Sequence, residues 1–274
     1  MTIDGATRLF AIVGDPVVQV RSPSVYTACF AQAGLNAVLV AAQASRENFD
    51  TAMRGLMSLG NLDGLLITSP HKAAALGFAS RVSTRARVVG AVNALRREPD
   101  GSWTGDMFDG VGFAHAAQRL APIADKRVLL FGCGGAGAAI AAELAAQGAR
   151  SISLVDPEVN RAQRLLAALT EHFPHCTVAP AGNGEQYDCV VNASVVGMNE
   201  GDGLPGDPGP LGAQSLVGDV VLRPPAQPTA LVALARSAGA RIVTGQDMHA
   251  GQVEAILNFF TPTHDRASLN QGER

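Results

Sequence analysis

The sequence predicts an α/β protein whose two consecutive halves each contain alternating strands and helices with parallel sheets. Three observations support this prediction. Short apolar runs alternate with longer helix-forming segments from end to end, glycine or proline separates many of them, and a glycine-rich turn joins a strand to a helix in the second half. The 274 residues are enough for one large core or two modest ones.

In the first half, glycine, proline and other turn residues between the segments mark the ends of most of the expected elements. The first helix begins after Ser22-Pro23 and ends before Gly34, and a proline occupies the first turn of a later helix at 70–79. Asp100-Gly101 predicts the turn of a β-hairpin. In order, we expect a strand at 9–13, a helix at 24–33, a strand at 37–42, a helix at 48–59, a strand at 65–68, a helix at 70–79, a hairpin of 91–97 with 103–106, and a helix at 112–120.

The second half begins with a strand at 127–131, a turn, a helix at 138–147 and a second strand at 151–155 that leads to Asp156. The turn consists of small residues, namely Gly132, Cys133, Gly134, Gly135, Ala136 and Gly137. Together these features are the fingerprint of a doubly wound Rossmann domain. Glycines let backbone N–H groups approach a pyrophosphate at a helix N-terminus, so we expect a nicotinamide or flavin dinucleotide. The alternative is a glycine turn required only for close packing of strand and helix.

The residues after the second strand favour NAD over NADP. A carboxylate at Asp156 can accept hydrogen bonds from the ribose hydroxyls of NAD, and it repels a 2′-phosphate. Pro157 and Glu158 follow, so the loop starts with a second acid and no base. Arg161 and Arg164 lie within the next helix. We interpret them as part of its solvated face, and the alternative is that they swing back toward the loop.

Strand–helix units continue to about residue 243, and a last helix is expected at 248–260. The glycine- and proline-rich stretch 199–214 is interpreted either as a surface loop near the cofactor or as a segment without function. We place a substrate-binding domain at 1–120, completed by 245–274, and a dinucleotide-binding domain at 121–244. Because ligands of such sheets bind at the carboxyl ends of strands, we expect the reactive cleft between the two halves.

Composition narrows the compartment and the partners. A net charge of −3 gives no basic field for nucleic acid or an anionic membrane, so we expect a small-molecule substrate and neither of those partners. No signal-like start or membrane-length apolar run is present, and widely spaced cysteines predict buried free thiols in a reducing cytoplasm. No histidine pair has metal-ligand spacing with an acid nearby, so we expect no metal. The sequence leaves the oligomeric state open, a homodimer included. The cysteines are Cys29, Cys133, Cys176 and Cys189.

Polar clusters at predicted strand ends of the first half are the candidates for chemistry. They lie at 21–23, 68–72, 91–93 and 105–110. An enzyme that oxidises an alcohol with a nicotinamide needs a group that takes the hydroxyl proton. A lysine with a lowered pKa can do this, and a carboxylate can position it, so Lys72 and Asp109 are plausible partners. The alternatives are a solvated lysine in a first helical turn and an aspartate that caps the helix before Gly110.

Six segments follow one another in the order found in one enzyme family, and on them the chain resembles the shikimate/quinate dehydrogenases from about residue 9 to 260. The segments are Gly14-Asp15-Pro16 leading to Ser22-Pro23, Thr68-Ser69-Pro70-His71-Lys72, Ala91-Val92-Asn93, Gly105-Asp106-Met107-Phe108-Asp109-Gly110, Asn192-Ala193-Ser194 with Gly197-Met198, and Gly245 with Met248 and Gln252.

The resemblance implies an NAD-dependent oxidoreductase that interconverts a ring alcohol and ketone on a shikimate- or quinate-like hydroxylated carboxylic acid. The family's name places such an activity in the shikimate pathway of aromatic amino acid biosynthesis. Lys72 and Asp109 would be the catalytic pair. Ser22, Thr68, Asn93 and Gln252 would bind substrate, and Asn192, Ser194 and Gly245 would join the glycine turn in binding the cofactor.

Several positions depart from the family pattern. Val20, Leu66, Met107 and Leu222 are apolar where the family has serine, asparagine, asparagine and often tyrosine, and His249 replaces a usually apolar residue. Losing charge-assisted hydrogen bonds to a carboxylate predicts poor shikimate binding. The alternatives are therefore the same chemistry on a less polar or aminated substrate, or a dinucleotide-binding regulator without catalysis. At the cofactor, Asp156-Pro157-Glu158 replaces the Asn-Arg-Thr of NADP-using members, which agrees with NAD.

Overall fold

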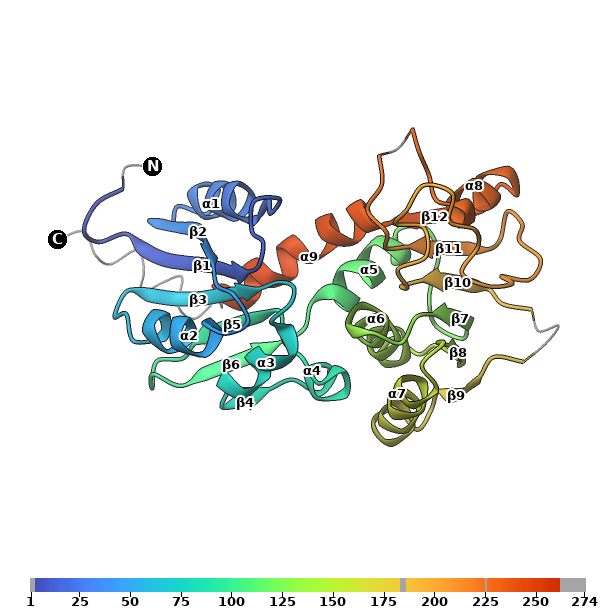
Figure 1. Ribbon diagram of the computed structural model, residues 1–274, viewed down its shortest axis with the longest axis horizontal. Helices are drawn as coiled ribbons and strands as arrows, with labels where there is room; N and C mark the ends of the chain where they lie inside the picture. The colour runs from blue at the N-terminus through green and yellow to red at the C-terminus, as the bar shows by residue number, and fades with distance from the viewer. Residues whose placement is uncertain (1–2, 183–185, 225, 262–274) are drawn as a thin grey trace. The chain divides into compact units, whose positions relative to one another are not determined.

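The computed structural model describes residues 3–182, 186–224 and 226–261. The chain divides into two compact units, unit 1 with Met1–Phe108 and Val253–Arg274, and unit 2 with Asp109–Gln252. Each unit contains its own six-stranded sheet flanked by helices (Figure 1). The predicted α/β class is therefore confirmed. The two units are described separately below.

Unit 1 is built on a mixed sheet with the strand order β2-β1-β3-β5-β6-β4. Strands β1, β2 and β3 are parallel, whereas β5 runs antiparallel to both β3 and β6. Its strands are β1 (Arg8–Gly14), β2 (Ala37–Gln43), β3 (Leu62–Ile67), β4 (Arg81–Val82), β5 (Ala94–Arg97) and β6 (Trp103–Asp106). Its helices are α1 (Ser22–Gln32), α2 (Phe49–Met57), α3 (Lys72–Ala75) with the 3₁₀ turn η1 (Leu76–Phe78), and α4 (Thr84–Val89).

The interior strand β1 is an almost continuous buried apolar run, which is typical of a strand covered on both faces. Val13 near its end pairs with Ile67 of β3, and Leu66 pairs with Ala94 at the start of β5. The carboxyl ends of β1 and β3 and the amino end of β5 therefore meet at one edge of the sheet. The predicted hairpin of β5 with β6 is confirmed, with Gly101 in the left-handed region at φ +81°.

One predicted helix of unit 1 is wrong in length. The segment predicted as a helix over 70–79 forms only the single turn α3 followed by η1. The two-residue strand β4 and helix α4 were not predicted. Helix α4 begins at the Ser83 N-cap, whose hydroxyl accepts a hydrogen bond from the Ala86 N–H at 3.2 Å, and its C-cap is Gly90 at φ +67°.

Unit 2 has a fully parallel sheet with the order β12-β11-β10-β7-β8-β9. Counted from β7, this is the doubly wound order 3-2-1-4-5-6 of a Rossmann domain, as predicted. The strands are β7 (Arg127–Phe131), β8 (Ser151–Val155), β9 (Thr177–Pro180), β10 (Cys189–Asn192), β11 (Leu216–Asp219) and β12 (Arg241–Thr244). The helices are α5 (Asp109–Gln118), α6 (Gly135–Ala146), α7 (Val159–His172) and α8 (Ala230–Ser237), while α9 (Gly245–Phe260) has residues in both units.

The boundaries of the compact units differ from the domain boundaries expected from sequence. Helix α5 and the start of α9 belong to unit 2, whereas we expected 109–120 and 245–252 in the first domain. Close packing explains the difference. A Cβ atom on Gly110 would overlap the Ala139 carbonyl of α6, and one on Gly218 of β11 would overlap the Phe113 ring of α5. These glycines let α5 lie directly against the sheet and helix of unit 2.

The loop at 199–214 has no regular secondary structure, as expected, but it is packed against the sheet of unit 2. Gly206 has no room for a side chain because the Phe131 ring lies against it. Leu211 packs on the buried clusters that contain Leu129 and Val217. The loop therefore borders the end of β7, where the glycine turn begins.

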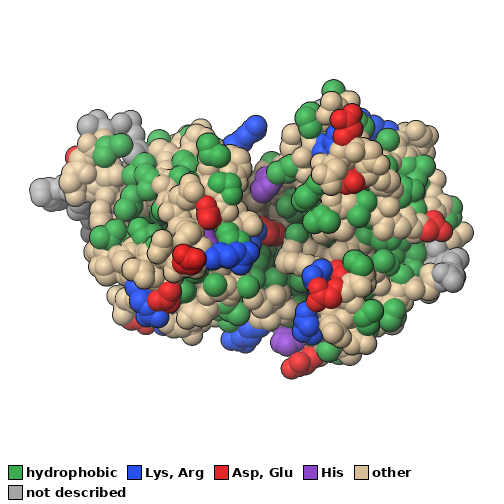
Figure 2. All heavy atoms as spheres, in the orientation of Figure 1, with side chains coloured by type: hydrophobic (Ala, Val, Ile, Leu, Met, Phe, Trp, Pro, Cys, Tyr) green, Lys and Arg blue, Asp and Glu red, His purple; other side chains and the backbone are tan. Residues whose placement is uncertain are grey.

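No helix in the described ranges is long and apolar enough to cross a membrane. On the face shown in Figure 2, Lys and Arg side chains lie beside Asp and Glu side chains instead of forming one region of single charge. The four cysteines are free thiols, three of them buried, while Cys29 is half-buried and departs from the expectation that all four are enclosed.

Candidate active site

Three of the predicted site residues of unit 1 meet at the sheet edge described above. The Ile67 N–H donates to the Asn93 carbonyl at 2.8 Å, so Thr68 directly after β3 lies beside Asn93 directly before β5. The Val92 N–H donates to the Lys72 carbonyl at 3.0 Å, which brings the start of α3 to the same edge. Segments 68–72 and 91–93, separated in sequence, thus present Thr68, Lys72 and Asn93 together.

Lys72 is half-buried and is the first residue of α3. The residue before it, His71, is buried and stacks on the Phe49 ring with centroids 4.1 Å apart and planes 10° apart. Its Nε2 lies 2.7 Å from the Ala44 carbonyl oxygen, to which it donates. Because α3 is a single turn, this anchor of its first residues fixes where the Lys72 backbone lies.

The segment leading to Asp109 is held by Asn93 and by a partly buried ion pair. The Asn93 Oδ1 accepts the Phe108 N–H at 2.9 Å. Arg85 donates from Nε and Nη2 to the two carboxylate oxygens of Asp106 at 2.8 and 2.6 Å, and its guanidinium lies 5.0 Å from the centre of the Phe108 ring. Such a bidentate pair restrains Asp106 and the two residues that follow it.

Asp109 and Gln252 are held in unit 2 by close helix packing. Asp109 is buried and is the first residue of α5. A Cβ atom on Gly112 would overlap the Met248 carbonyl oxygen of α9 and would lie 3.0 Å from the Gln252 Cβ. Gly112 therefore lets α9 approach α5, and the structure brings the helices of Asp109 and Gln252 together.

The division into units separates the predicted catalytic pair, with Lys72 in unit 1 and Asp109 in unit 2. Their pairing remains a prediction. His249, one turn before Gln252, lies with Nδ1 3.0 Å from the Gln252 Nε2. In the sequence His249 replaces a residue that is usually apolar in the family, and in the structure it contacts Gln252, a predicted substrate-binding residue.

Of the other predicted or altered substrate positions, some are enclosed and some keep exposed surface. Ser22 is half-buried at the start of α1, and Val20 in the loop before it is also half-buried. Leu66 and Met107 are buried, with Met107 fully enclosed. Leu222 is 59% exposed. Val20 and Leu222 are therefore the altered positions at which a ligand can meet apolar surface in place of polar groups.

The glycine turn of unit 2 combines two kinds of glycine. Gly132 is at φ +92°, and a Cβ atom on it would lie 2.7 Å from the Ser194 nitrogen, while one on Gly137 would overlap the Gly132 carbonyl. These two are required by packing. Gly134 and Gly135 have nothing within 4 Å of a Cβ position, so no neighbour in the described structure requires them to be glycine.

The open side of Gly134 and Gly135 lies at the N-terminus of α6. The first hydrogen bond of the helix runs from the Ala138 N–H to the Gly134 carbonyl at 2.8 Å, so the N–H groups of Gly135, Ala136 and Gly137 precede it. Backbone donors at a helix N-terminus beside side-chain-free surface are suited to a pyrophosphate. The residues present therefore fit a dinucleotide, and packing alone does not account for the turn.

Asp156 is tied to this turn by its carboxylate, which is 2% exposed. It accepts the Cys133 N–H at 2.7 Å and the Glu158 N–H at 2.8 Å, and Arg161 Nη1 lies 3.4 Å from both of its oxygens. Burial opposes ionisation, but these donors outweigh it and lower the pKa of Asp156 below 3.8. Burial, together with the Asp156 charge, raises the pKa of the Cys133 thiol to about 12.

Asn192 at the end of β10 is fully buried, and its amide organises the loop after it. Its Oδ1 accepts the N–H and the hydroxyl of Ser194 at 3.1 and 2.7 Å, and its Nδ2 donates to the Val196 carbonyl at 2.9 Å and to Asp219 at 3.2 Å. Ser194 is half-buried beside Gly132. The structure thus places Ser194 next to the glycine turn and gives Asn192 a supporting position beneath it.

Asp219 at the end of β11 was not identified from the sequence. Its Oδ2 accepts the Thr229 hydroxyl at 2.6 Å, and its Oδ1 accepts the Val221 N–H at 3.0 Å. Burial raises its pKa despite these donors and Asn192. Gly245, predicted near the nicotinamide, lies beside this strand end, because a Cβ atom on it would be 2.5 Å from the Val220 carbonyl oxygen.

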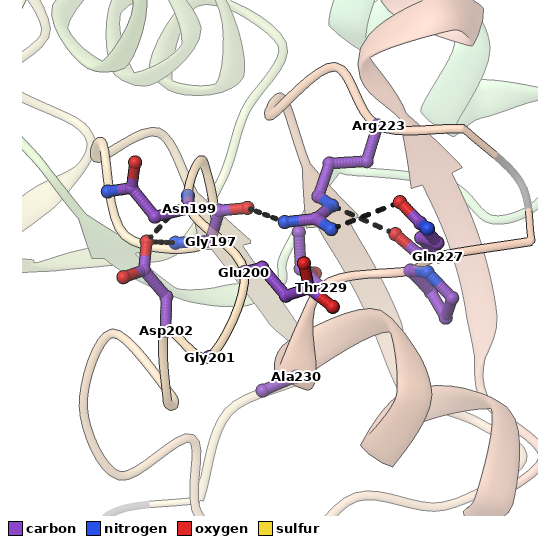
Figure 3. A pocket seen from close by; sticks show the side chains of 10 residues that line it. Gly197, Asn199, Glu200, Gly201, Asp202, Arg223, Gln227, Thr229 and Ala230 are labelled. Carbon is purple, nitrogen blue, oxygen red and sulfur yellow. Dashed lines mark hydrogen bonds between the residues drawn. The ribbon is translucent and has the colours of Figure 1, made fainter.

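A polar cavity of about 220 Å³ lies in unit 2 between the loops after β10 and β11 and the start of α8 (Figure 3). Arg223 crosses it, donating from Nη1 to the Gly197 carbonyl at 3.4 Å and from Nε to the Gln227 carbonyl at 3.0 Å. None of the predicted site residues lines it. In the part of the chain that the structure describes, no cluster of His, Cys, Asp or Glu is suited to a metal.

Comparison with known proteins decides the family. The profile of the shikimate dehydrogenase substrate binding domain matches residues 12–95. A shikimate dehydrogenase (NADP(+)) of Rubrobacter xylanophilus is 38% identical over 253 residues, which cover 90% of this chain and 88% of the relative. The chain belongs to the shikimate dehydrogenase family. The motifs identified in the sequence predicted this membership correctly.

Two solved structures show how widely the fold of this family is used. A quinate dehydrogenase from Corynebacterium glutamicum in complex with NAD has a TM-score of 0.81 and 28% identity, covering 96% of this chain and 97% of the other. The ligand-free 5-ketofructose reductase of a Gluconobacter strain has a TM-score of 0.83 and 26% identity, covering 97% of both chains.

As a member of the shikimate dehydrogenase family, the chain is an oxidoreductase that acts on an alcohol with a nicotinamide dinucleotide. Arg161 is 41% exposed, as expected for a solvated helix residue, but it also turns back to contact both Asp156 and Glu158. Asp219 carried no signal in the sequence beyond its place at a strand end.

Proposed function

We propose that this chain is an NAD⁺-dependent dehydrogenase that interconverts a ring alcohol and a ketone on a shikimate- or quinate-like hydroxylated acid. The observation that carries this proposal is the edge of unit 1, where Lys72 lies with Thr68 and Asn93 on segments matching the family. We also propose that the enzyme binds a small-molecule substrate and neither nucleic acid nor a membrane, and that it works in the reducing cytoplasm, which suits four free cysteines.

The proposed roles follow from the chemistry of each side chain. The neutral Lys72 Nζ accepts the proton of the substrate hydroxyl as the C–H bond breaks, and in the reverse direction its ammonium returns a proton to the carbonyl oxygen. Asp109 orients the Lys72 amine and balances its charge after proton transfer. A nicotinamide dinucleotide, when bound, supplies the hydride acceptor. Thr68, Asn93, Ser22 and Gln252 orient the ring through its hydroxyls and carboxylate.

The preference for NAD⁺ is supported by the acidic loop after β8. Asp156 is held as a carboxylate beside the glycine turn, and Glu158 adds a second negative charge two residues on. A 2′-phosphate approaching this loop is repelled by the Glu158 carboxylate at the surface and by the charge of Asp156, whose own carboxylate is buried and holds the loop. The Rubrobacter relative is named for NADP(+), so the proposal gives this chain a different cofactor preference on the basis of its own acidic loop.

A second candidate keeps the chemistry and changes the substrate to a less polar or aminated compound. It is favoured by the half-buried Val20 and the exposed Leu222, which offer apolar contact where the family has hydroxyl groups. Each missing charge-assisted hydrogen bond weakens carboxylate binding by about 1.5–3 kcal/mol. The similarity to a 5-ketofructose reductase supports this candidate, since a substrate named as a ketosugar lies outside the shikimate and quinate pair.

A screen of cofactor reduction tests these proposals together. NAD⁺ and NADP⁺ are each supplied with shikimate, quinate, an aminated analogue and neutral polyols, and the absorbance of the reduced cofactor is followed. Turnover with shikimate or quinate and NAD⁺ supports the first proposal. Turnover with the other alcohols alone supports the second. Tight binding of NAD⁺ without reduction on any substrate contradicts both and indicates a non-catalytic regulator.

A further inference from the structure

The residue after Pro157 forms an ion-pair cluster at the cofactor end of unit 2. Glu158 contacts Arg161 Nη2 through Oε2, and its Oε1 lies 3.6 Å from Arg164 Nη2. Arg161 also reaches the Asp156 carboxylate at 3.4 Å. Arg161 therefore lies against Asp156, where a ribose is expected, and both arginines contact the same glutamate.

Glu158 is not used as a helix cap, although it occupies the N-cap position of α7. Its side chain makes no capping hydrogen bond. The carboxylate is instead directed to Arg161 and Arg164, which lie in the first two turns of the helix. The side chains of Glu158, Arg161 and Arg164 are 51%, 41% and 70% exposed, so a ligand in solution can reach all three.

We propose that Glu158 acts as a counter-ion that withholds Arg161 and Arg164 from a phosphate on the ribose of the cofactor, and so determines the preference for NAD⁺. This inference rests on the proposed NAD⁺ preference and assigns it to a residue beyond Asp156. Two guanidinium groups beside a ribose would otherwise form a phosphate site, because arginine donors match phosphate oxygens in pairs. Glu158 occupies those donors and adds repulsion of its own.

These ion pairs contribute too little to stability for the folding of unit 2 to depend on them. An exposed pair three residues apart on a helix contributes little to stability, so removing it leaves unit 2 intact. Removing the charge of Glu158 releases donors of both arginines while Asp156 keeps its hydrogen bonds to the Cys133 and Glu158 backbone N–H groups. The expected change is therefore selective for the phosphorylated cofactor.

The test is the variant Glu158→Gln, with Glu171→Gln as the matched control. Glu171 is exposed near the other end of α7, so its substitution removes the same charge from the same helix. Dissociation constants of NAD⁺ and NADP⁺ are measured by calorimetry, which needs no substrate. We expect Glu158→Gln to tighten NADP⁺ binding about tenfold, with NAD⁺ binding within twofold of wild type, and Glu171→Gln to change neither.

A third variant identifies the donors. In Glu158→Gln combined with Arg161→Gln and Arg164→Gln, the gained NADP⁺ affinity is expected to disappear. The inference is overturned if Glu158→Gln leaves the ratio of the two dissociation constants unchanged, or if the control shifts it equally. Either result leaves the proposed NAD⁺ preference intact. A wild-type protein that binds NADP⁺ at least as tightly as NAD⁺ overturns both.

Discussion

The glycine turn of unit 2 and the polar edge of unit 1 are built in opposite ways. The turn is one contiguous segment whose glycines separate into those required by packing, Gly132 and Gly137, and those left open, Gly134 and Gly135. The edge brings Thr68, Lys72 and Asn93 together from segments on β3, α3 and β5. In a contiguous motif, a substitution at one residue disturbs the backbone of its neighbours. At an edge assembled from separate segments, one side chain can be replaced while the other segments keep their positions.

Three of the departures named from the sequence, Val20, Leu66 and Met107, lie on separate segments of unit 1. Replacing a residue such as Val20, in the loop before α1, changes one side chain and leaves the strands of the sheet in place. Replacing a residue of the turn disturbs the strand, the helix and the loop after β10 together, since Gly132 contacts Ser194. In the cofactor half, Glu158 lies after β8 and outside the glycine turn, whereas Asp156 holds the turn through the Cys133 N–H.

The largest expected effect is on the unit 1 side, at Lys72. Lys72→Met removes the proton acceptor, and we expect kcat to fall by about 10²–10⁴ while the dissociation constant of NAD⁺ stays unchanged. Lys126 is the other lysine of the chain, and Lys126→Met is the matched control with wild-type turnover. An unchanged kcat in Lys72→Met would remove Lys72 from the chemistry and reduce the edge to a binding surface.

The next largest effect distinguishes the two kinds of glycine in the turn, those required by packing and those left open. A methyl group at Gly137 must displace the Gly132 carbonyl, so we expect Gly137→Ala to lower the free energy of unfolding by about 1–3 kcal/mol or more. Gly135→Ala meets nothing, so we expect wild-type thermal stability with a dissociation constant for NAD⁺ at least about tenfold higher. Thermal melts and calorimetry on both variants give the comparison. Equal stability losses would mean that packing alone explains the turn.

A smaller effect tests whether restoring one polar side chain near the proposed substrate improves the turnover of shikimate. Val20→Ser restores a hydroxyl at a half-buried position beside Ser22, and we expect kcat/KM for shikimate to rise about tenfold through one charge-assisted hydrogen bond. Val18→Ser is the control, because Val18 is 92% exposed in the same loop. If both variants match wild type on shikimate while a neutral alcohol is turned over well, the substrate lacks the carboxylate.

The sequence predicted those features of the fold that depend on residues close together in the chain. The fingerprint from 127 to 156 predicted the Rossmann domain, and the motif order predicted the family. Contacts across the fold were not predictable in the same way. The segment 70–79 has helix-forming alanines, but after one turn it continues as a 3₁₀ turn. The burial of Asn192 beneath its loop and the pairing of Arg161 with Glu158 depend on neighbours that only the folded chain brings together.

The smallest effect concerns pH and the Asp156 network. The folded pKa of Asp156 lies below its ordinary value of 3.8, so its contribution to stability is present above pH 3.8 and is lost as the pH falls through the folded pKa. We expect Asp156→Asn to lower the free energy of unfolding by about 1 kcal/mol at pH 7, because one oxygen no longer accepts an N–H.

Denaturant unfolding of the cofactor-free protein between pH 7 and pH 3 measures this dependence. The difference in the free energy of unfolding between wild type and Asp156→Asn is expected to disappear as the pH falls. Glu171→Gln is expected to show no comparable difference from wild type. A gap that stays constant to pH 3 would mean that Asp156 acts through shape alone. A closing gap means that its charge holds the Cys133 and Glu158 N–H groups, which links the glycine turn to the acidic loop before any cofactor binds.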